Sequence, residues 1–441
     1  MNNLTYSEGS SSSDSEDFYL PDRIYYSGNA YALEHKGTYI PLKSASDVSA
    51  HLRSAGFEQA DTVGILCDIR TKNYVTYIGP VAGHPPGVYI SPDSGKKFLV
   101  TDGPLLIQGK PGAFPFIAAY LRELFGPEPI QIEAATAWVR QARENIVLKK
   151  RRPLAAGVLV GPRGCGKTLF IEMVRHLIGG RSASAYKALN GGTNFNADIL
   201  GAELLLIDDE QAGREYRTRM ALAQGIKKHL FAASVRIEGK HRDAITMRPI
   251  QALLIAVNSE PEHLEVLPTI DDSTKDKLSL FHCCHASLGG LERDEIWEQV
   301  TKEAPHFIHY LETSQHPEGL RDRRTGAAAW QNPIVLEILG DISLEEQFRE
   351  LLTQCSNITH MIEEAGAWDG TAMELETSLR DDPKTKLGAD RLIKHGKAVG
   401  GFLGKLQAAG RIVVTRRTVN GITRWRIASL SQEQGGKVDH L

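Results

Sequence analysis

The sequence predicts an α/β protein with a parallel sheet at its centre, a small α+β unit before this core and a basic helix-and-hairpin unit after it. Three apolar stretches of strand length carry the prediction, namely residues 157–160, 204–207 and 252–257. The first stretch runs into a glycine-rich loop and then an amphipathic helix, the order of strand, loop and helix in a βαβ unit. The other two end in polar side chains, so we expect a site at the ends of these strands.

Composition indicates several packed domains and no membrane segment. The chain has 441 residues, of which 41% are hydrophobic and 24% charged, the balance of a globular protein with more than one core. No apolar run approaches the roughly 20 residues that span a bilayer. The N-terminus also lacks the basic and apolar pattern of a signal peptide. We therefore expect a cytoplasmic protein with no membrane partner.

The cysteines predict neither a disulfide framework nor a zinc site. They number five and are scattered, which argues against paired disulfides. Residues 282–285 read HCCH, but adjacent residues of a strand point to opposite faces, whereas structural zinc sites space paired ligands by about two to four residues. A buried strand is the better interpretation of this run.

Shifts in composition and pattern divide the chain into six expected segments. The first is acidic and of low complexity, with no Lys or Arg, and we expect a mobile tail there. The segments are the acidic tail (1–22), an N-terminal α+β domain (23–130), the core (131–290), a helical segment (291–365), the helix-and-hairpin domain (366–430) and a second tail (431–441).

The N-terminal domain shows a pattern of short elements. We expect a hairpin around Gly37, a helix over 46–55 with its start signal at Ser44 or Ser46, and strands over 63–67, 74–78 and 97–101. The residue types in this domain suggest no chemistry.

A glycine-rich loop follows the first apolar stretch of the core. Residues 161–168 read GPRGCGKT, the full G-x-x-x-x-G-K-[ST] phosphate-binding pattern, also called Walker A. Glycines let backbone N–H groups curl around phosphates, Lys167 supplies charge to the β and γ phosphates, and Thr168 offers a hydroxyl to Mg²⁺. We therefore expect ATP and Mg²⁺ as cofactors, with the nucleotide bound by Gly161, Pro162, Arg163, Gly164, Cys165, Gly166, Lys167 and Thr168.

The second apolar stretch runs straight into three carboxylates. This is the Walker B arrangement, in which one acid holds the Mg²⁺ shell and the next orients or deprotonates water. We assign Asp208 to the metal together with Thr168, Asp209 to the base, and Glu210 as its reserve. The third stretch ends in Asn258, whose amide suits a hydrogen bond to the γ-phosphate or the attacking water, although an Asn after a strand is often only a turn residue.

Residues 225–249 lie between the second and third stretches and predict a helix followed by a basic hairpin. The helix ends near Phe231, one strand covers 235–237, and the return strand reaches Met247. Gly239 permits the turn, and polar and apolar residues alternate on both sides. The tip carries Lys240, His241 and Arg242, which an ordinary solvated hairpin could also carry.

The order and spacing of these elements resemble the superfamily 3 helicases, the hexameric AAA+ motors of small DNA viruses, phages and plasmids. The likeness is strongest to the helicase part of phage and mobile-element primase-helicases. FNADILGAELLLIDDEQ (195–211), IAVNSEPEHLEVLP (255–268) and DKLSLF (276–281) carry it, over about residues 20–430. The resemblance implies that Lys240, His241 and Arg242 contact DNA in a ring channel and that Asn258 is the sensor residue of the third strand.

One position departs from that family. Its members commonly place an Arg after the sensor strand, as a finger that reaches the γ-phosphate of the neighbouring subunit. The matching residue here is Lys277, a point charge without the planar fork of Arg, and Lys275 and Arg293 are other candidates.

The C-terminal domain reads as a winged helix. Residues 389–409 predict one helix, and two strands flank Asn420-Gly421, a strong hairpin signal. Nine Lys or Arg and no acid lie within 391–426, which favours DNA over the protein partners that other winged helices bind. The candidate DNA contacts are Lys394, Lys397, Lys405, Arg416, Arg417 and Arg424.

The sequence thus predicts an ATP-dependent DNA helicase that forms a homo-oligomeric ring, a hexamer by resemblance, and replicates a phage, plasmid or other mobile element. Residues 1–130 hold no primase-like D-x-D pair, so the polymerising half is expected to be missing or separate, with a separate primase or another replication protein as the expected partner. The open alternatives are a phage-defence or DNA-remodelling ATPase without processive unwinding, and an ATP-switched initiator or loader.

Overall fold

The computed structural model of the chain falls into two compact units. One comprises residues 1–257 and 274–330, and the other residues 258–273 and 331–441. The residues that it describes are 20–91, 94–149, 152–193, 199–208, 216–237, 245–264, 266–268, 274–315, 317–341, 344–393, 398–408, 410, 412–419 and 421–430.

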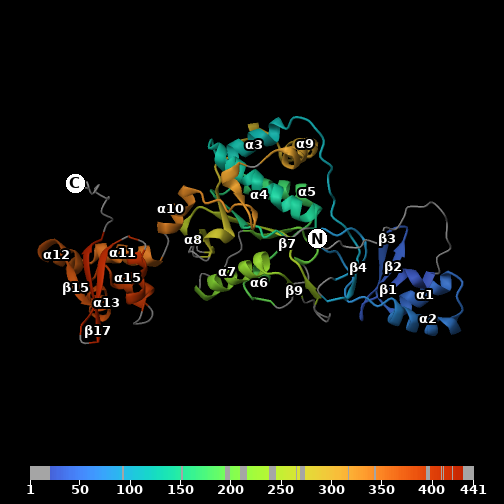
Figure 1. The fold of residues 1–441 in the computed structure, drawn as a ribbon, viewed down its shortest axis with the longest axis horizontal. Helices are drawn as coiled ribbons and strands as arrows, with labels where there is room; N and C mark the ends of the chain where they lie inside the picture. Colours follow the sequence, from blue (N-terminus) through green and yellow to red (C-terminus); the bar gives the residue numbers. More distant parts are fainter. Residues whose placement is uncertain are drawn as a thin grey trace. The chain divides into compact units, whose positions relative to one another are not determined.

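A five-stranded sheet forms the centre of the first unit (Figure 1) and confirms the α/β prediction. Its order is β12-β6-β11-β8-β7, so the strand that is fourth along the chain lies between the first and the third. β8 pairs in parallel with β7 and β11, and β6 pairs in parallel with β12. The strands are β6 (Ala156–Gly161), β7 (Ser182–Ser184), β8 (Leu204–Asp208), β11 (Ala252–Asn258) and β12 (Leu278–His282).

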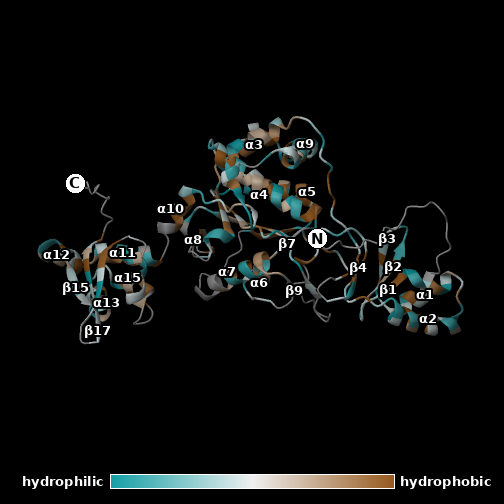
Figure 2. Ribbon diagram, viewed as in Figure 1, coloured by the Kyte–Doolittle hydropathy of each residue, from teal (hydrophilic) through white to brown (hydrophobic). Residues whose placement is uncertain are grey.

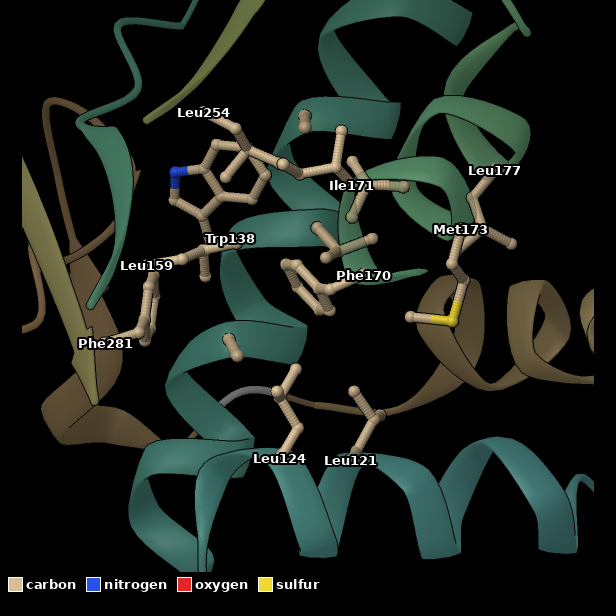
Figure 3. Close-up of a cluster of buried hydrophobic side chains, with 14 of the residues drawn as sticks. Leu121, Leu124, Trp138, Leu159, Phe170, Ile171, Met173, Leu177, Leu254 and Phe281 are labelled. Atoms are coloured by element: carbon tan, nitrogen blue, oxygen red, sulfur yellow. The ribbon is translucent and has the colours of Figure 1, made fainter. Parts of the chain in front are cut away.

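Four helices build the main core against this sheet. They are α3 (Pro115–Phe125), α4 (Pro129–Val147), α5 (Lys167–Ile178) and α9 (Arg293–Thr313). Along α4 and α5 the ribbon changes repeatedly between hydrophilic and hydrophobic, the pattern of helices with one buried face (Figure 2). Figure 3 shows Leu121 and Leu124 of α3 facing Phe170 of α5, and all three are buried.

A carboxylate that is distant in the sequence caps the N-terminus of α3. Pro115 occupies the first turn, where its missing N–H costs nothing. The next two N–H groups, of Phe116 and Ile117, donate to the carboxylate of Glu303 at 3.1 and 2.9 Å. Because Glu303 lies on α9, this charge-assisted cap joins two helices that are far apart in the sequence.

The segment over residues 20–100 confirms part of the predicted pattern of short elements. β2 (Tyr31–His35) and β3 (Thr38–Leu42) form the hairpin around Gly37, and the side chain of Ser44 caps α1 (Ala45–Ser54). Its other elements are η1 (Leu20–Arg23), β1 (Ile24–Tyr26), α2 (Gln59–Lys72), β4 (Gly87–Ile90) and β5 (Lys97–Val100).

Two strand predictions in this segment need correction. Residues 63–67 lie inside α2, where Ile65 and Ile69 are buried at helical spacing, so the period is that of a helix and not of a strand. Residues 74–78 form only two isolated bridges, Tyr26 with Tyr74 and Ile78 with Leu99.

A buried ion pair attaches the end of this segment to the sheet. Glu203 is fully buried just before β8, and its carboxylate accepts hydrogen bonds from the guanidinium of Arg181 and from the backbone N–H of Gly83. Arg181 also donates to the carbonyl of Asp102 at 2.7 Å. Arg181 also donates to the carbonyl of Val81 at 3.3 Å, so two of its remaining N–H groups meet oxygens of the N-terminal segment.

The predicted helix and hairpin between β8 and β11 are confirmed in their described parts. α7 (Tyr216–Phe231) ends at Phe231, and β9 (Val235–Ile237) pairs with β10 (Ile245–Met247) in antiparallel fashion. The tip residues Lys240, His241 and Arg242 lie outside the described residues. The short helix α6 (Tyr186–Leu189) precedes β8.

A small hairpin follows α9 within the first unit. β13 (Arg321–Asp322) and β14 (Gly326–Ala327) pair in antiparallel fashion, after the single turn η5 (Glu318–Leu320). Thus the segment that was predicted to be wholly helical contains a two-stranded interruption.

The second unit has a core of its own, built from helices and a three-stranded sheet of order β15-β17-β16. The helix predicted over 389–409 is instead two helices, α14 and α15, while the hairpin around residues 420–421 is confirmed. Its elements are α8 (Pro261–Leu264), α10 (Pro333–Asp341), α11 (Leu344–Gln354), α12 (Ser356–Ala365), β15 (Trp368–Thr371), α13 (Ala372–Asp381), α14 (Lys386–Leu392), α15 (Ala398–Ala408), β16 (Val413–Val419) and β17 (Ile422–Ser429). Across both units, no helix in the described part of the chain combines the length and hydropathy needed to cross a membrane.

Candidate functional site

The glycine-rich loop joins the end of β6 to the start of α5. Gly164 and Gly166 have φ values of +73° and +113°, a region that side chains disfavour, and these two residues turn the chain back toward the helix. Gly161 is needed for a different reason. A Cβ added there would lie 2.7 Å from the Cβ of Cys283 and closer still to the Cys283 carbonyl oxygen. The first glycine therefore lets the segment after β12 pack against the loop.

The loop is tethered from α3. The hydroxyl of Tyr120 donates to the carbonyl of Gly166 at 3.0 Å, and Tyr120 itself is buried. Burial raises the pKa of Tyr120 well above its ordinary value, so the hydroxyl keeps its proton and its role as donor. The backbone N–H of Ala286 donates to the carbonyl of Cys165 at 3.1 Å. These contacts hold the loop from two sides.

The loop lysine points back along its own loop. Nζ of Lys167 donates to the carbonyls of Gly161 and Pro162 at 2.8 and 2.9 Å, and the residue is only 9% exposed. Thr168 is the second residue of α5 and is exposed, as is Arg163. The loop therefore leads directly into the N-terminus of α5, where Lys167 and Thr168 are the first two residues.

The parallel sheet brings the loop and the first carboxylate to one edge. β6 ends at Gly161 and β8 ends at Asp208, which is exposed. β11, which lies between these strands in the sheet, ends at Asn258, a residue 9% exposed. Asp209 and Glu210 lie outside the described residues. All three strand ends therefore lie at the carboxyl edge, where α/β sheets place their ligands.

This set of groups fits a nucleoside triphosphate with Mg²⁺. Backbone N–H groups at a helix N-terminus and an ammonium match phosphate oxygens. A hydroxyl and a carboxylate are the oxygen donors that Mg²⁺ prefers. The fit rests on Lys167, Thr168 and Asp208.

Lys277 lies at the opposite edge of the sheet. It is the last residue of η3 (Lys275–Lys277), immediately before Leu278, which pairs with Ala156 at the start of β6. The loop begins at Gly161, five residues further along β6, or about 16 Å at ~3.3 Å per residue. Lys277 therefore cannot reach a phosphate held by the loop of its own chain.

Lys277 is also enclosed. It is 9% exposed, pairs with the carboxylate of Asp276, and places Nζ 4.6 Å from the ring centre of Phe231. The same carboxylate pairs with Arg324 at 2.5 Å, and Arg324 lies 5.6 Å from the same ring. Burial raises the pKa of Asp276, but hydrogen bonds from Lys277 and Arg324 outweigh this effect, and the pKa lies below its ordinary value.

Arg324 is a candidate functional residue that the sequence motifs do not indicate. Its side chain is 58% exposed, so it presents to solvent the charge that Lys277 buries. It is 47 residues downstream of Lys277, in the turn between β13 and β14, and only the run RDRR at 321–324 could have drawn attention to it. Of the other candidates, Arg293 pairs with Glu172 of α5 at 2.7 Å, and Lys275 is exposed.

In the second unit, several basic side chains of residues 391–426 pair with acids from outside that stretch. Asp369 of β15 accepts hydrogen bonds from Arg417 at 2.7 Å and from Arg424 at 3.0 Å, and Lys405 pairs with Glu345 at 2.6 Å. Arg416 instead lies over the ring of Trp425. Lys394 and Lys397 lie outside the described residues.

Arg426 is the exposed arginine of this sheet that the sequence analysis did not select. It lies on β17 opposite Thr415 and Asp369, on the same face as Arg417 and Arg424, and it forms no ion pair with any described residue. Asp369 and Arg417 are 48 residues apart in the sequence, and the sheet brings them together. A count of the charges near Arg417 in the sequence could not reveal this pairing.

Comparison with protein families finds one match. A model described as a family of unknown function, DUF5906, matches residues 159–275, from β6 to the start of η3. Comparison with curated proteins finds no match.

Solved structures show the fold. The A-form apo structure of the NrS-1 C-terminal region is 14% identical, covers 92% of this chain and 96% of that chain, and has a TM-score of 0.54. A second apo structure of that region, also 14% identical, covers 92% and 95% with a TM-score of 0.52. The SCCmec type IV Cch active helicase is 10% identical, covers 86% and 68%, and has a TM-score of 0.32, too low to establish a shared fold. The chain therefore has the fold of the NrS-1 region.

The tether of Tyr120 generates a prediction for the loop. Tyr120→Phe removes one hydrogen bond to Gly166 and keeps the ring, so we expect Mg·ATP affinity to fall about three- to tenfold with little loss of thermal stability. Isothermal titration and a thermal melt measure both quantities. Tyr310→Phe, a partly exposed tyrosine of α9, is the matched control. Unchanged affinity in Tyr120→Phe would mean that the loop holds its shape without α3.

Proposed function

We propose that this chain is an ATP-dependent DNA helicase of the superfamily 3, AAA+ kind, which works as a homo-oligomeric ring on single-stranded DNA. The observation that carries the proposal is the carboxyl edge of the sheet, where β6 ends in a complete phosphate-binding loop and β8 ends in Asp208. The fold shared with the NrS-1 region and the resemblance of the motifs support it further.

In the proposed reaction each edge residue has one role. Lys167 offsets the charge of the β and γ phosphates, and Thr168 with Asp208 holds the Mg²⁺ shell, which supplies charge neutralisation when bound. Asp209 takes the proton of the attacking water, with Glu210 in reserve, and Asn258 orients that water or the γ-phosphate. The catalytic gain comes from charge placed where negative charge develops.

The opposite edge supports a ring. A cation that stabilises the transition state must come within a few ångströms of the γ-phosphate. Lys277 and Arg324 lie at the amino edge and cannot reach the site of their own chain, so they act in trans on a neighbouring subunit. Arg324 is the exposed member and has the planar fork, and Lys277 and Asp276 position it. We propose a hexamer from the resemblance.

DNA contacts are proposed at two places. The first is the segment between β9 and β10, in which Lys240, His241 and Arg242 contact single-stranded DNA in the ring channel. The second unit, as a winged helix, contacts duplex phosphates through Arg416 and Arg426, because these cations have no acidic partner among the described residues, whereas Asp369 and Glu345 occupy Arg417, Arg424 and Lys405. We also propose that the chain acts in the replication of a phage, plasmid or other mobile element, with a separate primase or another replication protein as a partner.

A forked-duplex unwinding assay beside DNA-stimulated ATP hydrolysis tests the proposed function. The wild-type chain should unwind with ATP, and Lys167→Ala should lose at least a hundredfold in turnover, because the phosphates lose their main counter-charge. Hydrolysis without unwinding would favour the remodelling ATPase, and nucleotide binding without turnover would favour the switched loader. Full ATPase activity in Lys167→Ala would overturn the site.

Mixed rings test the action in trans. Arg324→Ala should lower ring turnover about a hundredfold or more while nucleotide affinity stays nearly constant, since the charge acts only in the transition state. When Arg324→Ala subunits are mixed with Asp208→Asn subunits, some interfaces join an intact Asp208 to an intact Arg324, so partial activity should return. Lys302→Ala, which removes an exposed cation of α9, is the control. No recovery in co-assembled rings would show that Arg324 does not act across the interface.

Releasing the paired arginines tests the winged helix. Asp369→Asn frees Arg417 and Arg424 and should raise non-specific duplex affinity about three- to tenfold, whereas Arg426→Ala should lower it by a similar factor. Asp381→Asn, an exposed acid of α13, changes the net charge equally without freeing an arginine. Fluorescence anisotropy over a range of salt gives the affinities. Equal effects of Asp369→Asn and Asp381→Asn, or none, would favour a protein partner.

A further inference from the structure

A second charged pocket lies in the first unit, away from the nucleotide loop. It has a volume of about 940 Å³ and shares no residue with 161–168. Its walls come from the middle of α4, the end of α9 and the β13–β14 hairpin. The lining residues are Arg140, Gln141, Glu144, Arg152, Ser314, Gln315, Glu318, Arg321, Asp322, Arg323 and Gly326.

The pocket contains a buried arginine that forms no ion pair with any described residue, although the nearby Glu144 favours its charged form. Arg140 is 8% exposed, and its guanidinium donates to two neutral groups, the carbonyl of Tyr310 at 3.4 Å and the hydroxyl of Ser314. Nε of Arg140 has no hydrogen-bond partner in the structure. Burial lowers the pKa of this guanidinium, yet an arginine keeps its charge in proteins. A buried cation of this kind is costly unless an anion completes it.

Further arginines surround this buried group. Arg321 and Arg323 are exposed and form no ion pair with any described residue. Arg152 is 56% exposed and lies 3.9 Å from Glu144, a distance at which the pair is weak. The pocket thus gathers four guanidinium groups, each able to bind two oxygens of one anion.

The three carboxylates of the lining do not cancel this charge. Asp322 accepts hydrogen bonds from the backbone N–H groups of Arg324 and Thr325, both at 2.8 Å, and from the Thr325 hydroxyl. These bonds hold the pKa of Asp322 below its ordinary value and commit its oxygen to shaping the turn. Glu144 and Glu318 are the other two acids, so four guanidinium groups face three carboxylates and the lining keeps a net positive charge.

The hairpin wall is held in place by close packing. Gly326 has a φ of +82°, and an added Cβ would lie 2.8 Å from Cδ of Gln141. The side chain of Gln141 is in turn bonded to Asn145 at 3.0 Å, and Asn145 fixes the backbone of Arg152. The arginines therefore project from a rigid frame, which lowers the entropic cost of binding.

From this geometry we propose that the pocket is a second phosphate-binding site, separate from the nucleotide loop. The lining has no aromatic side chain on which a base could stack and is rich in guanidinium groups, which favours recognition of phosphate. The phosphate comes either from the backbone of a nucleic acid or from a free polyphosphate compound. The site does not depend on the proposed ATPase, because none of its residues takes part in that reaction.

Tripolyphosphate binding to the full-length Lys167→Ala chain tests the site with the nucleotide loop disabled. Isothermal titration should detect binding, and Arg321→Ala/Arg323→Ala in that background should weaken it about tenfold or more, since charge-assisted hydrogen bonds are lost. Arg122→Ala/Lys302→Ala removes two exposed cations elsewhere in the same unit and should leave the affinity unchanged. Arg140→Met should abolish binding, and a thermal melt shows whether that variant still folds.

Two further arms identify the source of the phosphate and challenge the site. If anisotropy with labelled oligothymidylate shows that the Arg321/Arg323 variant also loses DNA affinity and about 0.7 in salt slope per lost contact, the source is nucleic acid. If only tripolyphosphate binding is lost, the source is a free compound. Absence of tripolyphosphate binding to Lys167→Ala, equal binding by the Arg321/Arg323 variant and its control, or equally strong binding of a polyglutamate peptide would each overturn the proposal.

Discussion

The parallel direction of the central strands is the constraint on which the rest of this structure depends. It gives the sheet two edges with different chemistry. The carboxyl edge receives the ends of β6, β8 and β11, and hence the loop, Asp208 and Asn258. The amino edge receives Lys277, and through Asp276 it also receives Arg324. A strand length separates the two, so a group at one edge completes a site at the other only if a second molecule supplies it.

The loop owes its shape to groups that touch no phosphate. Tyr120 bonds to Gly166, and the helix that carries Tyr120 begins at a carboxylate supplied by α9. Figure 3 shows the apolar contact between α3 and α5 that keeps this arrangement together. Three segments far apart in the sequence therefore set the position of one lysine, which is why a preorganised site needs a large surrounding core.

Local pattern sufficed for elements whose signals are local. Ser44 marked the start of α1, the alternation of polar and apolar residues predicted the pairing of β9 with β10, and the GPRGCGKT loop marked its neighbouring strand and helix. Local sequence patterns failed where long-range packing determines the structure. Residues 63–67 resemble a strand until packing buries Ile65 and Ile69 on one side of α2. Residues 391–426 contain no acid, so the sequence alone predicts unpaired positive charge there. In the fold, β15 places Asp369 beside Arg417 and Arg424. Arg324 is recognised as a candidate only through its contacts with Asp276 and Phe231, neither of which lies near it in the sequence.

Gly161 changes how substitutions at this loop are to be interpreted. The residue is the first glycine of a phosphate-binding pattern, and its loss would ordinarily be taken as damage to ligand recognition. Here the space for a side chain is filled by the backbone of Cys283, so a larger residue would displace the end of β12 before any ligand arrived. An inactive allele at position 161 would therefore report misfolding, and a second-site suppressor would be expected near Cys283 rather than around the phosphates.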